Sequence, residues 1–222
     1  IGHLDVMRFF QKAIRRAGID VAYSEGFSPH QIMSFAAPLG VGLSSKGEYL
    51  DIEVKSHNGA EDMKRRLNDA MVEGLEIKNI TLLKEGAKNA MASVAAAEYS
   101  IRFRPGYEPD FDWTDRLMEF YNRPSIMVNK KTKKSEKEMD LKPYIYHLSV
   151  SGEGRNAVVH MLVNASSSGN IKPRLVVDAF FKANGKELSD FALEITREDI
   201  FTDNGMDGGF HMVPLDAVGT EF

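Results

Sequence analysis

Hydrophobic residues recur at helical spacing near the start of the chain and alternate with polar residues in several later stretches. In residues 3–18, HLDVMRFFQKAIRRAG, apolar positions fall every three or four residues, which predicts an amphipathic helix that ends at Gly18. From Glu48 to Val54 apolar and polar residues alternate strictly, which predicts a strand with one buried face. The same reasoning predicts short extended segments at residues 19–23 and 33–35, a helix at 60–73 and a strand at 75–83.

The second half of the chain shows a similar succession of elements. Helices are expected at residues 114–122, before Pro124, and between Pro173 and Gly185. Residues 129–142, NKKTKKSEKEMDLK, hold six lysines against three acidic residues, and the acidic residues favour a solvated hairpin over a phosphate-binding one. Strands are predicted at residues 98–104, from 126–128 onward, and at 144–150, 157–164 and 191–200.

Both halves fit one α+β arrangement. The order βαββαβ is the ferredoxin-like split βαβ pattern, so we expect two tandem ferredoxin-like lobes. Residues 84–97 lack a sustained hydrophobic period and are expected to connect the halves, which places lobe one at residues 1–86 and lobe two at residues 98–201. Residues 202–222 are expected to form an irregular tail. No strand precedes the helix at residue 3, so the first strand of lobe one is expected to be missing.

The composition narrows the classes of protein that fit. The 222 residues are 43% hydrophobic and 27% charged, which is typical of globular chains. The absence of cysteine excludes disulfides, thiol nucleophiles and cysteine-bound iron–sulfur clusters on this polypeptide. A formal net charge of −4 argues against a general DNA-coating protein but permits a local basic face. Neither a spanning segment nor a signal peptide is recognisable, so a cytoplasmic location without membrane contact is expected.

Four cationic residues mark the polar face of the first helix. Arg8, Lys12, Arg15 and Arg16 fall at positions i, i+4, i+7 and i+8, so they share one side of the helix. A solvated outer face is the default explanation for such a stripe, and a phosphate-binding surface is the alternative.

The stretch after this helix, YSEGFSPHQIMSFAAPLGVG at residues 23–42, is dense in special backbone positions. Gly26 can adopt a positive φ and Pro29 keeps Ser28 out of the helical region, so the loop is expected to present its side chains in a fixed arrangement. Tyr23 and Phe27 are the aromatic residues best placed to stack on a base, and the alternative is that Phe27 fills the edge of the core. The expected binding surface combines this loop with the helix: His3, Asp5, Arg8, Lys12, Arg15, Arg16, Tyr23, Ser24, Gly26, Phe27, Pro29 and His30.

Recognisable catalytic and metal motifs are missing from the sequence. The six histidines are scattered without metal-ligand spacing, so neither a metal nor a cofactor is expected. Ser24 and Ser28 do not lie in a G-x-S-x-G elbow, and the GVG at residues 40–42 is not followed by G-K-S/T. His3 and Asp5 can either cap the first helix or contact a ligand. We therefore expect binding and no catalysis by this chain.

Several separated blocks of the sequence resemble one family. HLDVMRFFQKAIRRAG, YSEGFSPHQIMSFAAPLGVG and GEYLDIEV, together with KEMDLKPYI in the second half, resemble the radical SAM-linked protein family, a bacterial domain of uncharacterised function. Members of that family occur beside, or fused after, a cobalamin-binding radical SAM protein. The resemblance implies a radical SAM partner, and the absence of cysteine agrees with an iron–sulfur cluster on that other polypeptide. Typical members begin with a strand before the His-Leu-Asp motif. This chain has the motif, at residues 3–5, but lacks the strand before it.

Three hypotheses follow for the function. The first is a non-catalytic accessory module that binds RNA or a modified substrate for a partner radical SAM enzyme. The two-lobed arrangement also resembles CRISPR repeat-processing RNA endonucleases, which suggests a metal-independent ribonuclease with His3 or His30 as general acid or base. The third is a protein-interaction scaffold that does not contact nucleic acid.

Overall fold

The computed structural model describes residues 2–131, 136–205 and 211–222, and the chain divides into two compact units. Unit 1 is formed by Ile1–Val41, Glu48–Val94 and Thr202–Phe222, and unit 2 by Gly42–Gly47 and Ala95–Phe201. Each unit therefore contains segments that lie far apart in the sequence. In the described residues, no helix has the length and apolar character needed to cross a membrane.

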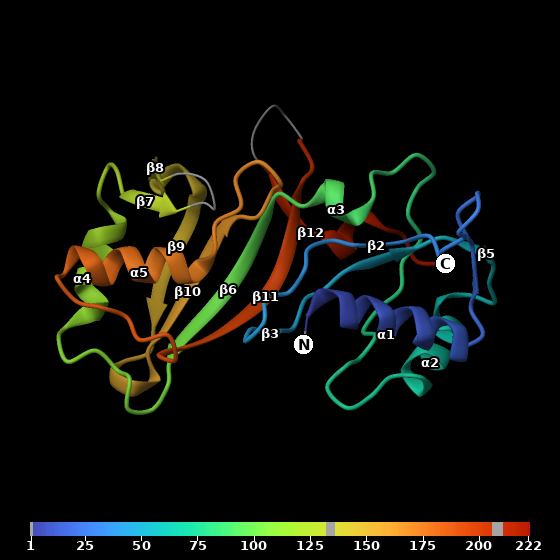
Figure 1. The fold of residues 1–222 in the computed structure, drawn as a ribbon, viewed down its shortest axis with the longest axis horizontal. Helices are drawn as coiled ribbons and strands as arrows, with labels where there is room; N and C mark the ends of the chain where they lie inside the picture. Colours follow the sequence, from blue (N-terminus) through green and yellow to red (C-terminus); the bar gives the residue numbers. More distant parts are fainter. Residues whose placement is uncertain (1, 132–135, 206–210) are drawn as a thin grey trace. The chain divides into compact units, whose positions relative to one another are not determined.

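Unit 2 is built on an antiparallel sheet whose strands follow one another in the order β11-β6-β10-β9 (Figure 1). These strands are β6 (Ala96–Phe103), β9 (Ile145–Ser151), β10 (Val158–Asn164) and β11 (Leu193–Asp203). Helix α4 (Trp113–Tyr121) follows β6, and α5 (Pro173–Ala183) joins β10 to β11. The shorter elements are β3 (Ser44–Ser45), which runs parallel to β11, the hairpin of β7 (Met127–Lys131) and β8 (Glu136–Asp140), and 3-10 turns at Lys142–Tyr144 and Gly154–Asn156.

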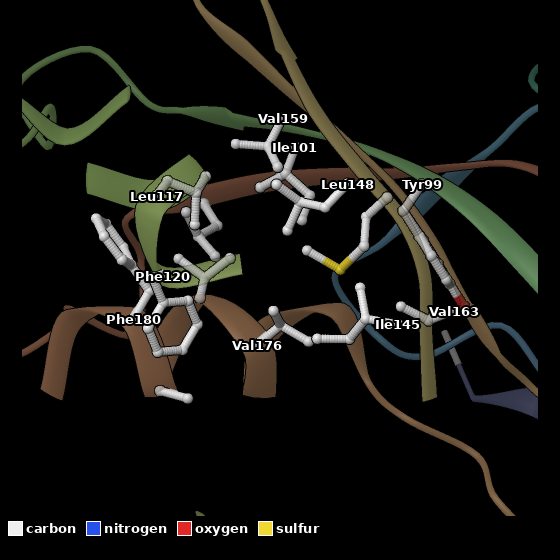
Figure 2. Close-up of a cluster of buried hydrophobic side chains, with 14 of the residues drawn as sticks. Tyr99, Ile101, Leu117, Phe120, Ile145, Leu148, Val159, Val163, Val176 and Phe180 are labelled. Atoms are coloured by element: carbon white, nitrogen blue, oxygen red, sulfur yellow. The ribbon is translucent and has the colours of Figure 1, made fainter. Parts of the chain in front are cut away.

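The two helices of unit 2 cover one face of its sheet. Tyr99 and Ile101 of β6 point into a buried cluster with Leu117 and Phe120 of α4 and Phe180 of α5 (Figure 2). Since successive side chains of a strand point to opposite faces, the residues between them occupy the other face of the sheet. On β6 that other face carries the polar residues Glu98, Ser100 and Arg102.

Unit 1 contains short strand pairs and two longer helices. Strands β1 (Asp20–Val21) and β5 (Val54–Ser56) form one two-stranded sheet, and β2 (Met33–Phe35) and β4 (Leu50–Ile52) form another. Ile14 and Ile19 bury apolar surface against Met63 and Leu67. The helices are α1 (His3–Arg16), α2 (Ala60–Asp69) and the short α3 (Ala90–Ser93), and the last segment contains β12 (Met212–Pro214) and a 3-10 turn at Leu215–Val218.

The α+β class is confirmed, whereas the two tandem ferredoxin-like lobes are not. The strand predicted at residues 75–83 is absent, because that segment has no extended partner and makes only an isolated bridge between Leu82 and Thr220. The predicted helix 60–73 ends at Asp69, before the turn that contains Gly74. The segment predicted as an irregular tail contains a strand and a turn, and Leu215 is buried.

Candidate functional site

Cationic side chains converge on the outer face of α1. Lys12, Arg15 and Arg16 line a shallow depression of about 350 Å³, and all three are exposed. Among the residues that the structure describes, Lys12 and Arg15 have neither an ion-pair nor a hydrogen-bond partner. Their positive charge is therefore available to an anion from solution.

The other two arginines of the predicted stripe already contact protein groups. Arg8 lies 3.7 Å from Asp5, in a pair that is more than half exposed. Arg16 donates a hydrogen bond of 2.8 Å to the carbonyl of Ala70, and its guanidinium lies over the ring of Phe9. Arg16 thus fixes α1 to the end of α2 while it also borders the depression.

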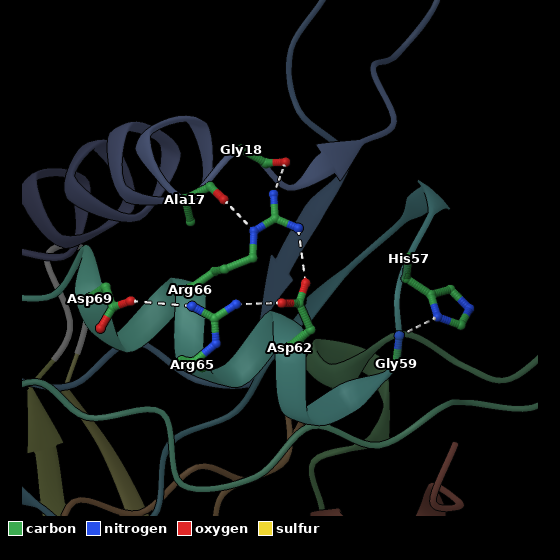
Figure 3. A network of polar contacts seen from close by, with 8 residues as sticks. All are labelled: Ala17, Gly18, His57, Gly59, Asp62, Arg65, Arg66 and Asp69. Atoms are coloured by element: carbon green, nitrogen blue, oxygen red, sulfur yellow. Dashed lines mark hydrogen bonds and ion pairs between the residues drawn. The ribbon is translucent and has the colours of Figure 1, made fainter.

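The C-terminal end of α1 is held by Arg66 of α2, as Figure 3 shows. The Arg66 Nε atom donates to the carbonyl of Ala17 at 2.9 Å, and its Nη2 atom donates to the carbonyl of Gly18. Its Nη1 atom lies 3.2 Å from Asp62. Gly18 has φ +63, and an added Cβ would lie 2.9 Å from the Arg66 side chain, so glycine suits both the backbone and the contact.

A hairpin follows α1 and closes at Ser24 and His30. The amide of Ser24 donates to the carbonyl of His30 at 2.9 Å, the amide of His30 donates to Ser24 Oγ at 3.1 Å, and Ser24 Oγ lies 2.9 Å from His30 Nδ1. Gly26 has φ +107 at the tip. Phe27 is fully exposed, so the alternative that it fills the core is wrong.

Gln31 attaches this hairpin to α1. Its Nε2 atom donates to the carbonyl of Gln11 at 3.2 Å, and its residue is 4% exposed. Gln31 also pairs with Tyr23 across the hairpin, and Tyr23 is 45% exposed. The hairpin with Phe27 and Pro29 is therefore fixed at its base to the helix that carries the cations.

The two histidines of the predicted surface have separate surroundings. The His3 ring lies edge-on to Phe35, with 5.3 Å between ring centroids, whereas His30 contacts Ser24. Gly2, which has no side chain, occupies the N-cap of α1, and among the described residues no backbone amide of the first turn donates to the side chain of His3 or Asp5, so the capping role considered for them is not formed. The described contacts of His3 and His30 do not join them into a single catalytic pair.

Unit 2 carries a second group of polar side chains that the sequence reasoning did not identify as a site. It lines a hollow of about 470 Å³ on the open face of the sheet, here called the polar hollow, whose lining includes Lys46, Glu98, Ser100, Arg102, His160 and Glu198. These residues come from β6, β10 and β11 and from the segment beside β3. The alternation of Glu98, Ser100 and Arg102 in the sequence places them on one face of a strand. It does not show which residues of other strands lie beside them, because that depends on strand pairing.

Glu198 is the most constrained carboxylate of the polar hollow. It lies 2.8 Å from Lys46 Nζ and accepts a hydrogen bond from Ser100. Burial is the largest single effect and by itself would raise the pKa of Glu198, but the hydrogen bonds from Lys46 and Ser100 and the nearby positive charge together lower that pKa. Glu198 is therefore ionised at neutral pH.

The described residues offer no cluster of three or more histidine or acidic side chains able to hold a metal ion. The lysine-rich segment that the sequence marked at residues 129–142 falls partly outside the described residues, which omit residues 132–135.

Comparison with known proteins gives a fold likeness and a family. No curated protein matches the sequence. A chain from the "Crystal Structure of a Cbf5-Nop10-Gar1 Complex" is similar with a TM-score of 0.50 and 13% sequence identity, which shows likeness of fold alone. The match covers 90% of this chain and 45% of that chain, so this chain spans less than half the length of its structural relative. A family model matches residues 1–173, and the chain belongs to that family, described as "Uncharacterized protein conserved in bacteria (DUF2344)".

Proposed function

We propose that the chain is a non-catalytic module that binds single-stranded RNA through unit 1 and presents it to a partner radical SAM enzyme. The observation that carries this proposal is the convergence of Lys12, Arg15 and Arg16 on one depression of α1. Phosphate groups are the anions that a row of exposed cations attracts along an RNA backbone.

The hairpin attached to α1 supplies the second element of such a surface. Single-stranded RNA is commonly bound by stacking its bases on aromatic side chains beside a cationic track. Phe27 is fully exposed and Tyr23 is 45% exposed, on a hairpin whose base is bonded to α1 through Gln31. Because the Phe27 ring is fully exposed, it can stack on a base without leaving the core.

The radical SAM partner is proposed from the sequence resemblance and from the absence of cysteine in this chain. We also propose that unit 2 is a ferredoxin-like lobe, because its principal elements follow the order βαββαβ and its strands the order β11-β6-β10-β9. The likeness to a chain of the Cbf5-Nop10-Gar1 complex concerns the fold and does not bear on the ligand.

A charge-reversal experiment tests the RNA-binding surface. Lys12→Glu with Arg15→Glu is compared with Lys84→Glu and Lys88→Glu, an exposed pair in unit 1 with the same change in net charge. Fluorescence anisotropy with a labelled single-stranded oligonucleotide measures affinity over a series of salt concentrations. The first pair is expected to lower affinity about tenfold or more and to flatten the salt dependence, with a slope change of about 0.7 for each lost phosphate contact. Equal losses in both pairs, or no binding by the unchanged protein, would contradict the proposal.

The ribonuclease alternative is separated by incubating the protein with labelled RNA in a chelator. The binding proposal expects intact RNA. Cleavage that disappears in His30→Ala would instead favour the ribonuclease. Partner binding that is insensitive to salt, together with no RNA affinity, would favour the protein-interaction scaffold.

A further inference from the structure

The lining of the polar hollow of unit 2 carries a positive side chain, Arg102, and a negative one, Glu98, at separate positions along β6. This arrangement suits a small molecule with opposite charges at its two ends. We propose that it binds an extended zwitterion, with the anionic end of the ligand at Arg102 and its cationic end at Glu98. A dipeptide is the simplest member of this chemical class. This site is separate from the RNA surface proposed for unit 1.

The charge order comes from the alternation of β6. Arg102, Ser100 and Glu98 lie on the same face of the strand at every second position, so the backbone positions of the two charged residues are about 13 Å apart. Both side chains are long, so their charged groups can lie closer together than their backbone positions. A ligand that contacts both therefore carries its charges several bonds apart, which excludes a simple inorganic ion.

The middle of the hollow supplies groups for a polar, uncharged part of the ligand. Strand register places Thr196 and His160 on either side of Ser100. His160 Nε2 lies 2.8 Å from Ser151 Oγ, and Ser100 donates to Glu198. These contacts fix the side chains before a ligand arrives, and hydroxyl and imidazole groups can pair with a peptide bond.

The charged ends are available for binding. In the described part of the chain, neither Arg102 nor Glu98 has an ion-pair partner, whereas Glu198 is already paired with Lys46. Glu194 lies directly opposite Arg102 in the strand register, so it competes with an incoming carboxylate for the guanidinium. Removing the charge of Glu194 is therefore expected to help the ligand.

Other ligand classes fit the hollow less well. Three glutamates among its lining residues repel a polyanion such as RNA, and its described lining includes no phenylalanine, tyrosine or tryptophan on which a base could stack. The described acidic and histidine residues do not cluster for a metal ion. The volume of about 470 Å³ lies within the range of small-molecule sites, about 300–1,000 Å³.

Titration calorimetry of the full chain with glycylglycine tests this site. Binding is expected in the millimolar range. Arg102→Gln and Glu98→Gln are each expected to weaken it about tenfold, since each removes a charge-assisted contact. Glu194→Gln removes the competitor for Arg102 and is expected to bind more tightly, whereas Glu187→Gln, at an exposed glutamate of unit 2 outside the hollow, is expected to bind as the unchanged protein does. Succinate and 1,4-diaminobutane carry only one sign of charge and are expected to bind at least about tenfold more weakly.

Each other outcome overturns the assignment. Undetectable binding of glycylglycine would exclude a site for this class of ligand. Binding of succinate or 1,4-diaminobutane as tight as that of glycylglycine would show that Arg102 and Glu98 do not bind the two charges of one ligand together. Weakening by Glu187→Gln equal to that by Arg102→Gln and Glu98→Gln would indicate an effect that is not confined to the hollow. None of these outcomes affects the RNA proposal, because Lys12 and Arg15 lie in unit 1 and the hollow is lined by unit 2 residues.

Discussion

Arg66 shows how one side chain can position a candidate binding helix. Its three contacts join the two carbonyls that directly follow α1, those of Ala17 and Gly18, to Asp62 of α2, and its side chain is only 28% exposed (Figure 3). We expect Arg66→Ala to lower the free energy of unfolding of unit 1 by about 2 kcal/mol, because backbone carbonyls and a carboxylate lose a charged donor. Urea denaturation followed by circular dichroism measures the change.

Arg65 provides the matched control, since it also pairs with Asp62, at 2.6 Å. Its side chain is 64% exposed, so Arg65→Ala is expected to cost less than about 1 kcal/mol. If the two variants lose the same free energy of unfolding, the hydrogen bonds from Arg66 to the carbonyls of Ala17 and Gly18 contribute little to stability.

Individual residues of the candidate surface were predictable to different degrees. The helical period places Lys12 and Arg15 on the outer face of α1, where the structure finds them exposed. The same period cannot show that Arg16 bonds to the carbonyl of Ala70, because that partner is 54 residues away in the chain. The helical period also could not predict whether Phe27, which lies in the hairpin after α1, is exposed or buried.

At the scale of elements, the segment of β3 is held against β11 at a position where only glycine fits. A Cβ added to Gly47 would lie 2.6 Å from the carbonyl oxygen of Glu198 and 2.8 Å from the Cα of Asp199. Gly47→Ala is expected to destabilise unit 2 by about 1–3 kcal/mol, because backbone atoms must move apart. Thermal denaturation measures the loss, and an unchanged midpoint would show that the segment shifts freely.

The longer elements were predictable where one face is buried throughout. The alternation of β6 and β10 and the helical period of α1 each agree with the observed element, since burial of a single face imposes that pattern. Residues 75–83 also contain apolar residues, yet they form no strand, because a strand requires a partner that local sequence does not specify. The polar hollow was missed for a related reason, since its residues become neighbours only through strand register.

At the scale of the whole molecule, the two units are each assembled from distant segments. The sequence suggested a division near residues 84–97, but composition gives no sign that residues 42–47 pair with β11. It likewise gives no sign that the last residues close unit 1. The amide and carbonyl of Leu82 exchange hydrogen bonds of 2.8 and 2.9 Å with Thr220, and such contacts across 138 residues are invisible to a local period.

Phe222 tests the contribution of this last segment to unit 1. Its ring lies 4.8 Å from that of His57 and packs, partly buried, against the unit 1 core, and its carbonyl accepts from Ala60 at 3.4 Å. We expect Phe222→Ala to destabilise unit 1 by about 2 kcal/mol, less than a fully buried phenylalanine would cost. Hydrogen exchange is then expected to quicken at Met63 and Leu67 and to stay unchanged in β6 and β10. Phe191→Ala, which removes a ring that is 71% exposed in unit 2, serves as the control and is expected to change neither. Faster exchange in β6 and β10 of the Phe222 variant would mean that the two units unfold together.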